Sequence, residues 1–449
     1  MRKQFLLLAG ISALAAVALG ADPALAQETE AAAEAAAGVP AESAYVFNTL
    51  LFLMAGFLVM FMAAGFCMLE AGLVRSKNVS MQCLKNISLY SLAGIMYWVV
   101  GYNLMYTGVD DNGNLFGTFA PYSWPGAGEA NEGDYSVASD WFFQMVFCAA
   151  TASIVSGALA ERIKLWPFLI FTAFLTGIFY PITGSWQWGE GWLFDRGFSD
   201  FAGSTIVHSV GGWAALTGAI ILGARSGKYG ADGSITPLPG SSLPLATLGT
   251  FILWLGWFGF NGGSQLAMGS NADVSDVSRI FANTNLAAAA GVMAAVILTQ
   301  VIYKKIDLTM ALNGALAGLV SITAEPLMPS PFLAIVIGAI GGVIVVVTVP
   351  LLDKLKIDDV VGAIPVHLFA GIWGTLAVPL SNGAANFGTQ SIGILAYGAF
   401  TVIASAIVFL ILKFTIGLRV SDEEEALGLD MSEVGLEAYP EFGQGSQRL

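Results

Sequence analysis

Apolar segments long enough to cross a membrane follow one another along most of this chain. A hydrocarbon core about 30 Å thick requires roughly 20 apolar residues in a helix that rises about 1.5 Å per residue. Eleven segments approach or exceed that length, and short or charged loops separate them. They cover residues 46–70, 84–107, 141–161, 165–185, 201–224, 243–267, 279–303, 309–327, 331–352, 360–380 and 391–416. The pattern predicts an all-α polytopic membrane protein with eleven transmembrane helices.

The composition agrees with that fold class and excludes an ordinary soluble domain. Hydrophobic residues make up 56% of the chain and charged residues only 11%. The 53 glycines suit helices that pack closely through small residues. The net charge of −14 comes mainly from acids near the N-terminus, in the loop 109–140 and after Ser421. Because these acids lie in solvated ends, we expect no nucleic-acid partner.

The first 26 residues have the features of a secretory signal peptide. Arg2 and Lys3 precede an apolar run at 5–19, and Ala24-Leu25-Ala26 resembles a cleavage site. We expect the mature N-terminus to lie outside the cytoplasm. The predicted divisions of the chain are a signal peptide (1–26), a disordered acidic Ala-rich leader (27–44), a membrane domain (45–417) and a cytoplasmic tail (418–449).

The basic residues alternate between loops as the positive-inside rule requires. With the N-terminus outside, 14 of the 18 Lys and Arg would lie in inner connections or in the tail. Two more belong to the signal peptide, and only Arg196 and Arg279 remain for the outer face. We therefore expect an N-out/C-in topology in the inner (plasma) membrane of the cell.

The two histidines of the chain lie inside apolar segments with the same local sequence. Asp200-x7-His208-x3-Gly212 belongs to the fifth segment, and Asp359-x7-His367-x3-Gly371 belongs to the tenth. Eight residues put each imidazole about 12 Å from its Asp, near the middle of the membrane. These two segments would cross in opposite directions, which predicts a five-plus-five inverted repeat with an additional C-terminal helix. Ionisable groups at matched depth indicate a transport path.

Two facing imidazoles are compatible with several kinds of chemistry. A neutral imidazole both donates and accepts a hydrogen bond, so the pair can guide a molecule with N–H groups or relay a proton. Burial disfavours the charged form. In a purely structural alternative, each histidine only bonds to a neighbouring helix. A metal site or an enzyme is disfavoured, because no Cys or Glu lies within a turn of either histidine and no nucleophile accompanies them.

Four stretches resemble the signature sequences of the ammonium transporter family, which includes the Rh proteins. They are Asp200-Phe-Ala-Gly-Ser-Thr-Ile-Val-His208, Gly157-Ala-Leu-Ala-Glu-Arg-Ile163, Gly256-Trp-Phe-Gly-Phe-Asn-Gly-Gly-Ser264 and Asp358-Asp-Val-Val-Gly-Ala-Ile-Pro-Val-His367. The resemblance covers about residues 45–440. It implies a homotrimer of eleven-helix protomers, each with its own narrow pore.

The resemblance also implies roles for particular residues. His208 and His367 match the twin histidines of the pore, and Phe147 and Phe260 match two stacked rings above them. The outer ammonium site is matched by Trp188, Ser264 and Phe147, and the pore lining and its support by Trp257, Gln144, Asp200 and Asp359. Since both aspartates stand where helices start, helix capping is an alternative to a direct role.

Other polar residues of the apolar segments receive no transport role. Glu70, Glu161 and Glu325 stand at span ends, where we expect them to bind neighbouring loops. Cys67, Cys83 and Cys148 are expected to be unreactive small hydrophobes.

The segment after the last apolar stretch is similar to the family's cytoplasmic tail, which packs across the inner face and couples protomers. It runs from Gly417 to Tyr439. The His and Glu that usually flank its glycine are Val434 and Leu436 here, so those two polar side chains are missing. Among bacterial members, the resemblance implies a PII-type signalling protein as a partner at this face.

These features predict a membrane transporter that captures ammonium at an outer aromatic and Ser site. Aromatic faces attract a small cation, and ammonium donates four N–H bonds. The ion would lose a proton, and ammonia, with or without that proton, would pass the twin histidines. The alternatives are an ammonium sensor acting through a cytoplasmic partner and a neutral gas channel of the Rh type. We expect no enzymatic activity, no cofactor and no fused kinase or cyclase domain.

Overall fold

The computed structural model describes residues 39–126 and 134–441. The expected signal peptide, most of the expected leader and the last eight residues of the tail lie outside the described residues. Within the described part, every regular element is a helix. The β-type pairings found there are two isolated bridges, Ile163 with Arg419 and Tyr229 with Ile235. The prediction of an all-α protein is therefore confirmed for this part of the chain.

Nine helices in the described ranges are long and apolar enough to cross a membrane. They are α3 (Ala41–Leu73); η1 (Ser76–Asn78), α4 (Val79–Met96), η2 (Tyr97–Gly101) and α5 (Tyr102–Tyr106) as one continuous span; α6 (Val137–Ala158); α7 (Leu165–Phe174), η4 (Leu175–Phe179) and α8 (Tyr180–Ser185) as one span; η5 (Ser204–Ser209) with α9 (Val210–Leu222); α10 (Leu243–Gly263); α11 (Asn271–Tyr303); α13 (Pro331–Lys354); and α15 (Phe387–Thr415).

Two shorter apolar helices accompany these nine. The first is α12 (Leu308–Thr323), and the second is the run of η6 (Ile364–Phe369), α14 (Ala370–Ala377) and η7 (Val378–Leu380). Each of the eleven predicted segments thus coincides with a helix. The remaining elements are η3 (Asp110–Asn112), α16 (Asp422–Leu427) and η8 (Asp430–Val434).

Several helices begin earlier than their apolar segments do, and α3 and α11 show the reason. The structure starts α3 at Ala41, so the last four residues of the expected leader are helical rather than disordered. Ala and Glu favour helix, and Pro40 directly precedes the first turn. Helix α11 begins at Asn271 instead of 279, where the Ser270 side chain accepts a hydrogen bond from the Asp273 amide. A capped polar turn therefore extends this helix beyond its apolar stretch.

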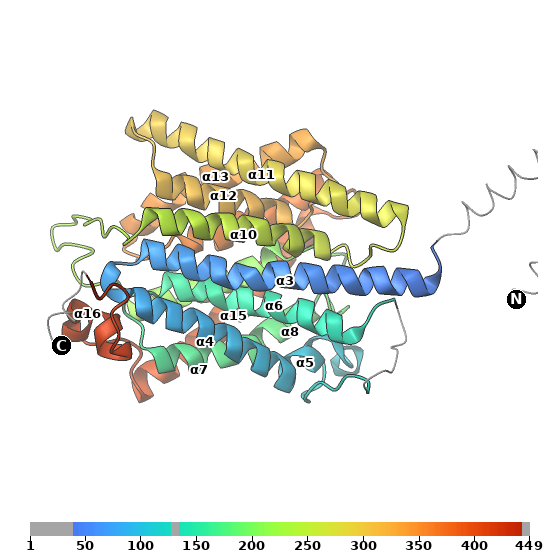
Figure 1. Ribbon diagram of the computed structural model, residues 1–449, viewed down its shortest axis with the longest axis horizontal. Coiled ribbons are helices and arrows are strands. Elements are labelled where there is room, and N and C mark those ends of the chain that lie inside the picture. The colour runs from blue at the N-terminus through green and yellow to red at the C-terminus, as the bar shows by residue number, and fades with distance from the viewer. Residues whose placement is uncertain (1–38, 127–133, 442–449) are drawn as a thin grey trace, which may run out of the picture.

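The long helices lie side by side along the long axis of the molecule (Figure 1). Helix α3 begins at one end, which we call the head end, and α16 packs at the opposite end, which we call the tail end. Helix α6 is buried along most of its length, and α3 and α10 pack against each other beside it. The buried core therefore runs between the two ends of the bundle.

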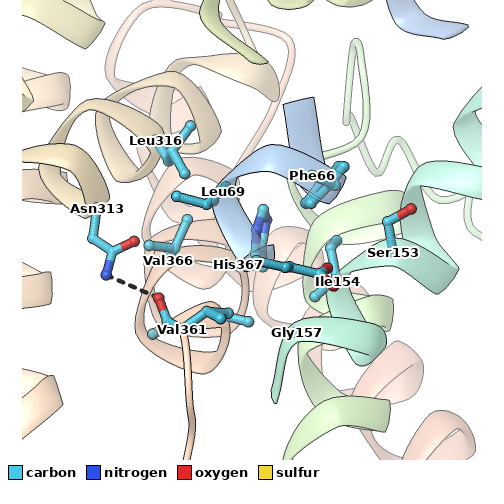
Figure 2. Close-up of a pocket in the computed structure, with 13 residues that line it drawn as sticks. Phe66, Leu69, Ser153, Ile154, Gly157, Asn313, Leu316, Val361, Val366 and His367 are labelled. Atoms are coloured by element: carbon cyan, nitrogen blue, oxygen red, sulfur yellow. Dashed lines mark hydrogen bonds between the residues drawn. The ribbon is translucent and has the colours of Figure 1, made fainter. Parts of the chain in front are cut away.

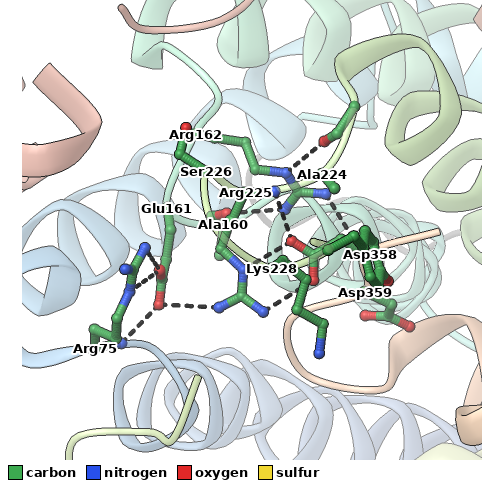
Figure 3. Close-up of polar contacts among 12 residues, drawn as sticks. Arg75, Ala160, Glu161, Arg162, Ala224, Arg225, Ser226, Lys228, Asp358 and Asp359 are labelled. Carbon is green, nitrogen blue, oxygen red and sulfur yellow. Dashed lines mark hydrogen bonds and ion pairs between the residues drawn. The ribbon is translucent and has the colours of Figure 1, made fainter. Parts of the chain in front are cut away.

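A network of buried charges joins several loops at the tail end (Figure 3). Arg225 donates to both carboxylate oxygens of Asp358, at 2.8 and 2.9 Å, and lies 3.4 Å from Glu161. Glu161 also accepts from the Arg75 backbone amide and side chain. The expectation that Glu161 binds a neighbouring loop is confirmed.

The tail packs against this network and against the start of α4. Glu425 accepts from the Ser226 amide and from Arg419, and the Asp430 carboxylate accepts from the Met81 amide. Val434 packs against an apolar cluster at this end, whereas the Leu436 side chain is exposed. The two departures from the family's tail sequence thus have different surroundings.

Candidate functional site

A hollow at the head end collects aromatic and polar side chains from several helices. It is lined among others by Tyr102, Tyr106, Tyr135, Asp140, Phe143, Gln144, Phe147, Trp188, Asp200 and Ser264. The Trp188 indole N–H donates to the Asp200 carbonyl at 3.0 Å, and the Ser264 hydroxyl donates to the Phe260 carbonyl at 2.8 Å. Because both donors bind the wall, the ring face of Trp188 and the lone pairs of Ser264 are left for a ligand.

Two phenyl rings close the inner end of this head-end hollow. The ring centroids of Phe147 and Phe260 lie 4.1 Å apart, and the rings are tilted by 32°. Phe147 also meets Trp188 edge-on at 5.9 Å. Both phenylalanines are buried, so a molecule that goes deeper must pass or displace a ring.

The two histidines lie next to each other directly behind these rings. The Nδ1 atoms of His208 and His367 are 3.1 Å apart, and both side chains are buried. The His208 ring lies nearly parallel to the rings of Trp257, at 4.9 Å, and Phe260, at 5.1 Å, which also neighbour each other at 5.6 Å. Trp257 is held in turn by a 2.8 Å hydrogen bond from its indole N–H to Thr323. The chain thus brings together two imidazoles that are 159 residues apart in sequence.

The tautomers of the two rings follow from this single contact. If both rings are neutral, one Nδ1–H must donate to the other Nδ1. The donor ring then has a bare Nε2, and the acceptor ring carries its proton on Nε2. In the described residues, Nε2 of His208 has no hydrogen-bond partner. The pair therefore offers one acceptor and one donor to a small molecule.

Each histidine lies in a π-helical turn whose start is bound by an aspartate. The Asp200 carboxylate accepts from the amides of residues 203–206, at 2.7 to 3.0 Å. The Asp359 carboxylate accepts from the amides of residues 361, 362 and 364, at 2.7 to 3.3 Å. Burial raises the pKa of Asp200 to about 6 and also raises that of Asp359, while these amide bonds oppose both shifts. Both aspartates thus have the hydrogen bonds of helix caps.

The two histidine segments enter the molecule from opposite ends. Asp200 lines the head-end hollow, whereas Asp359 lines a second hollow at the tail end together with Arg225, Asp353 and Asn313. A small cavity lies between this tail-end hollow and the histidines, because its lining includes His367 as well as Asn313 and Val361, which also line the hollow (Figure 2). The head-end hollow, the two phenyl rings, the two histidines, the small cavity and the tail-end hollow follow one another through the bundle. We call this series the path.

The residues singled out from the sequence fall along this series. Phe147, Phe260, His208, His367 and Trp257 form one contacting group of rings. Head-end positions are occupied by Trp188, Ser264, Gln144 and Asp200, and the tail-end position by Asp359. No group of three His, Cys, Asp or Glu side chains in the described ranges is arranged to hold a metal.

Two buried carboxylates beside the series received no site role from the sequence, which did not single out Asp140 and assigned Glu70 to loop binding. Asp140 lines the head-end hollow, where it accepts from the Tyr102 hydroxyl at 2.5 Å. Glu70 lines the small cavity beside His367. A sequence signal was present for Asp140, which stands four residues before Gln144 and shares a helix face with it. No such signal was present for Glu70, because Phe66, four residues before it, became recognisable only from its position beside His367.

Comparisons with known proteins point to one family. Residues 50–439 match the model of the Ammonium Transporter Family. The ammonium transporter Amt2 of Archaeoglobus fulgidus is 44% identical over 420 residues, which cover 87% of each chain. A putative ammonium transporter of a Synechocystis species is 41% identical over 88% of this chain and 90% of its own length.

Solved structures give the same result at the level of the fold. The structure of a protein called Sensor Amt Protein superposes with a TM-score of 0.81 and 37% identity, over 87% of this chain and 98% of its own. The crystal structure of Mep2 from Candida albicans superposes with a TM-score of 0.75 and 25% identity, over 84% and 87% of the two chains.

Proposed function

The chain belongs to the ammonium transporter family, and from that premise we propose that it carries ammonium or ammonia between the two hollows. The observation that carries this proposal is the contact between the buried imidazoles of His208 and His367, 3.1 Å apart, on the line between the hollows. A charged ion at mid-membrane costs several kcal/mol, of order 3 or more, whereas neutral ammonia avoids that cost. The path therefore suits a molecule that leaves a proton before it passes the rings.

Capture takes place in the head-end hollow, which faces the outside. Ammonium donates N–H bonds to the Ser264 hydroxyl and lies against the faces of Trp188 and Phe147. Asp140 adds a negative charge to the same hollow, which raises the local concentration of cations. Gln144 stands between Asp140 and Phe147 on the same helix and supports the carboxylate.

The proton separates before the molecule passes Phe147 and Phe260. One N–H bond of ammonium breaks, its electron pair stays on nitrogen, and the released proton goes to water in the head-end hollow, from where it returns to bulk solvent or moves on to the imidazole pair. Ammonia then donates to the bare Nε2 of one imidazole and accepts from the Nε2–H of the other. Transport is electrogenic if the proton follows through the pair, and electroneutral if it does not.

The proposed arrangement of the chain in the membrane rests on the same family membership and on the course of the histidine segments. The chain crosses the plasma membrane eleven times, N-terminus outside and C-terminus in the cytoplasm, as five-plus-five inverted repeats and a last helix. The opposite entry of the two capped histidine segments supports the inverted repeat. Helix α12 and the 364–380 run are short, and protein surrounds most of their side chains. Three such chains form a homotrimer, with one path in each.

An ammonium sensor is the second candidate, and one observation favours it. The solved structure with a TM-score of 0.81 belongs to a protein that is called a sensor, Sensor Amt Protein. In this alternative, ammonium bound in the path changes the conformation of the tail end, where α16 and η8 contact the loops of the bundle. A cytoplasmic PII-type protein detects that change.

The deciding experiment measures charge movement in proteoliposomes on a solid-supported membrane after an ammonium jump. Wild type is compared with the His208→Ala/His367→Ala double variant. A wild-type current that disappears in the double variant supports electrogenic transport through the histidines. Internal alkalinisation without current supports neutral ammonia conduction. If wild type produces neither signal, transport fails as the main function and the sensor is favoured.

A further inference from the structure

Glu70 lies on α3 one turn beyond the level of the histidines. The Phe66 ring centroid is 6.1 Å from that of His367, and Glu70 follows four residues later on the same helix. Four residues advance a helix by about 6 Å. Since α3 runs from the head end to the tail end, Glu70 stands between the histidines and the tail-end hollow.

The small cavity beside Glu70 is part of the path. Its lining includes Phe66, His367 and Glu70 at one side and Asn313 and Val361 at the other. The last two also line the tail-end hollow, and the Asn313 side chain donates to the Val361 carbonyl at 3.0 Å (Figure 2). The carboxylate therefore lines the cavity that separates His367 from the tail-end hollow.

The two oxygens of this carboxylate have different surroundings. Oε2 accepts hydrogen bonds from three neutral donors, the amides of Gln82 and Asn86 and the Ser156 hydroxyl. Oε1 has no hydrogen-bond partner among the described residues, although Glu70 is only 1% exposed. Gly157 also lines the cavity, and a Cβ built there would lie 3.4 Å from Oε1, so the missing side chain leaves that oxygen uncovered.

Lys85, the charged neighbour of Glu70, does not donate a hydrogen bond to Oε1. Lys85 is also buried, and its ammonium group donates to the Ser156 carbonyl at 2.8 Å and lies 5.0 Å from the Phe168 ring centroid. Ser156 thus contacts both charged side chains through different atoms. Burial of Glu70 disfavours the ionised carboxylate, whereas Lys85 and the three donors to Oε2 favour it. An ionised form of this buried oxygen, which has no donor, is a site for a small cation.

We propose that Oε1 of Glu70 binds ammonium on the tail side of the histidines. One N–H of the cation donates to Oε1, and the Phe66 ring, which lines the same cavity, attracts its charge. This site rests on the proposed function for its ligand but not for its geometry. Beyond the apolar stretch the lone pair of ammonia takes up a proton, from the imidazole pair or from water of the tail-end hollow. Oε1 holds the resulting ammonium before its release into that hollow.

A crystallographic experiment tests the site independently of transport. Crystals of the wild-type protein and of Glu70→Gln are soaked in rubidium chloride, since Rb⁺ is close to ammonium in size and has an anomalous signal. We expect an anomalous peak in contact with Oε1 in wild type and none in the variant. The proposal is overturned if wild type has no peak at Glu70, or if the peak remains in Glu70→Gln.

Ammonium-jump currents test whether the site serves transport. Glu70→Gln should lower the current on the order of tenfold, because a neutral amide loses the charge-assisted contact. Glu325→Gln is the matched control, a buried glutamate that binds Asn382 and the Met328 amide and lines none of the three cavities of the path. Equal currents in the two variants would contradict the proposal. Absence of wild-type current would instead reject the proposed function, while the rubidium peak would still decide the site.

Discussion

Along the path, two tryptophans bind the surrounding protein through their indole N–H groups. Trp188 donates to the Asp200 carbonyl, and Trp257 donates to Thr323. An N–H group that is already bonded to protein does not bind water in the path, whereas the ring face still attracts a cation. The carboxylates have the complementary role, because Asp140 and Glu70 supply charge at either side of the apolar stretch.

Asp140 provides the first prediction at this scale. Asp140→Asn keeps an acceptor for the Tyr102 hydroxyl but removes the negative charge from the head-end hollow. The ammonium concentration for half-maximal current should rise roughly threefold to tenfold, with the maximal current nearly unchanged. Ammonium titrations of the current in proteoliposomes measure both quantities.

Glu190→Gln is the control for this change. Glu190 lines the same hollow, but its side chain is exposed, so water and salt screen its charge. A shift in Glu190→Gln as large as that in Asp140→Asn would mean that the hollow responds only to total charge.

At the scale of elements, the two histidine helices share one more residue than the Asp, His and final Gly of the motif, namely a glycine three residues after the Asp. Both read Asp-x2-Gly-x4-His-x3-Gly, from Asp200 to Gly212 and from Asp359 to Gly371. The first glycines, Gly203 and Gly362, adopt φ values of +106° and +80°, where a side chain is strained. They allow the chain to fold back so that the aspartate reaches the amides of the following turn.

The last glycines of the pattern allow the two segments to touch. A Cβ built on Gly212 would lie 2.7 Å from the Leu368 amide nitrogen, next to His367. A Cβ built on Gly371 would lie 2.4 Å from the Ser204 carbonyl oxygen. These contacts are reciprocal between the two motifs, and they set the distance at which the imidazoles meet.

Gly212→Ala is the prediction that follows from this contact. The added methyl group must displace the backbone of η6, and with it His367, so the free energy of unfolding should fall by about 1–3 kcal/mol. Denaturant titration of the purified protein in detergent measures the loss. The ammonium-jump current should fall as well, because the two Nδ1 atoms separate.

Gly94→Ala in α4 is the matched helical glycine. Its built Cβ meets only Met145, at 3.7 Å, which is an ordinary contact. The variant should equal wild type in stability or exceed it slightly, since Ala favours helix over Gly. If the Gly94 and Gly212 variants behave alike, close approach of the motifs is not the reason for Gly212.

At the scale of the whole molecule, the tail end is held by charges that come from distant parts of the chain. Asp358 precedes the second histidine motif, Arg225 follows α9, and Glu161 belongs to the loop between α6 and α7. Burial acts to raise the pKa of Asp358, but the hydrogen bonds and charges of Arg225 and Arg162 outweigh it and hold that pKa below its usual range. The loops of both motifs are thus fixed to one another.

Asp358→Asn should therefore destabilise the protein at neutral pH. Removal of one partner of a buried pair costs about 3 kcal/mol, because Arg225 keeps its charge. A lowered pKa in the folded state stabilises the protein above the unfolded-state pKa and loses that effect as pH falls through the folded-state pKa. The difference in unfolding free energy between wild type and variant should accordingly be full at neutral pH and shrink as pH falls below 3.8, the ordinary pKa of an aspartate.

Asp353→Asn is the control at the same face. Asp353 pairs with Lys228 at 3.2 Å, but its side chain is 28% exposed, so the loss should stay below about 1 kcal/mol. If both aspartate variants lose the same free energy of unfolding, the buried pair with Arg225 stabilises the protein no more than the exposed pair does.

Much of this architecture could be predicted from the sequence, because hydrophobicity and helix periodicity act locally. All eleven apolar segments became helices, and the all-α membrane class and the family are confirmed. The matched aspartate and histidine spacing also indicated two equivalent segments. Helix ends were less predictable, as at Asn271, because a capping side chain rather than an apolar residue decides where a helix begins.

The sequence by itself determined which segments are helical and which side chains share a helix face, since both depend on neighbours within a few residues. Only the tertiary structure decided which faces meet. It brought His208 to His367 and left one oxygen of Glu70 uncovered beside them, although the sequence reasoning had assigned Glu70 to loop binding. The reason is physical: the rotation and spacing of packed helices depend on close contacts such as Gly212 with Leu368, which join residues far apart in the chain.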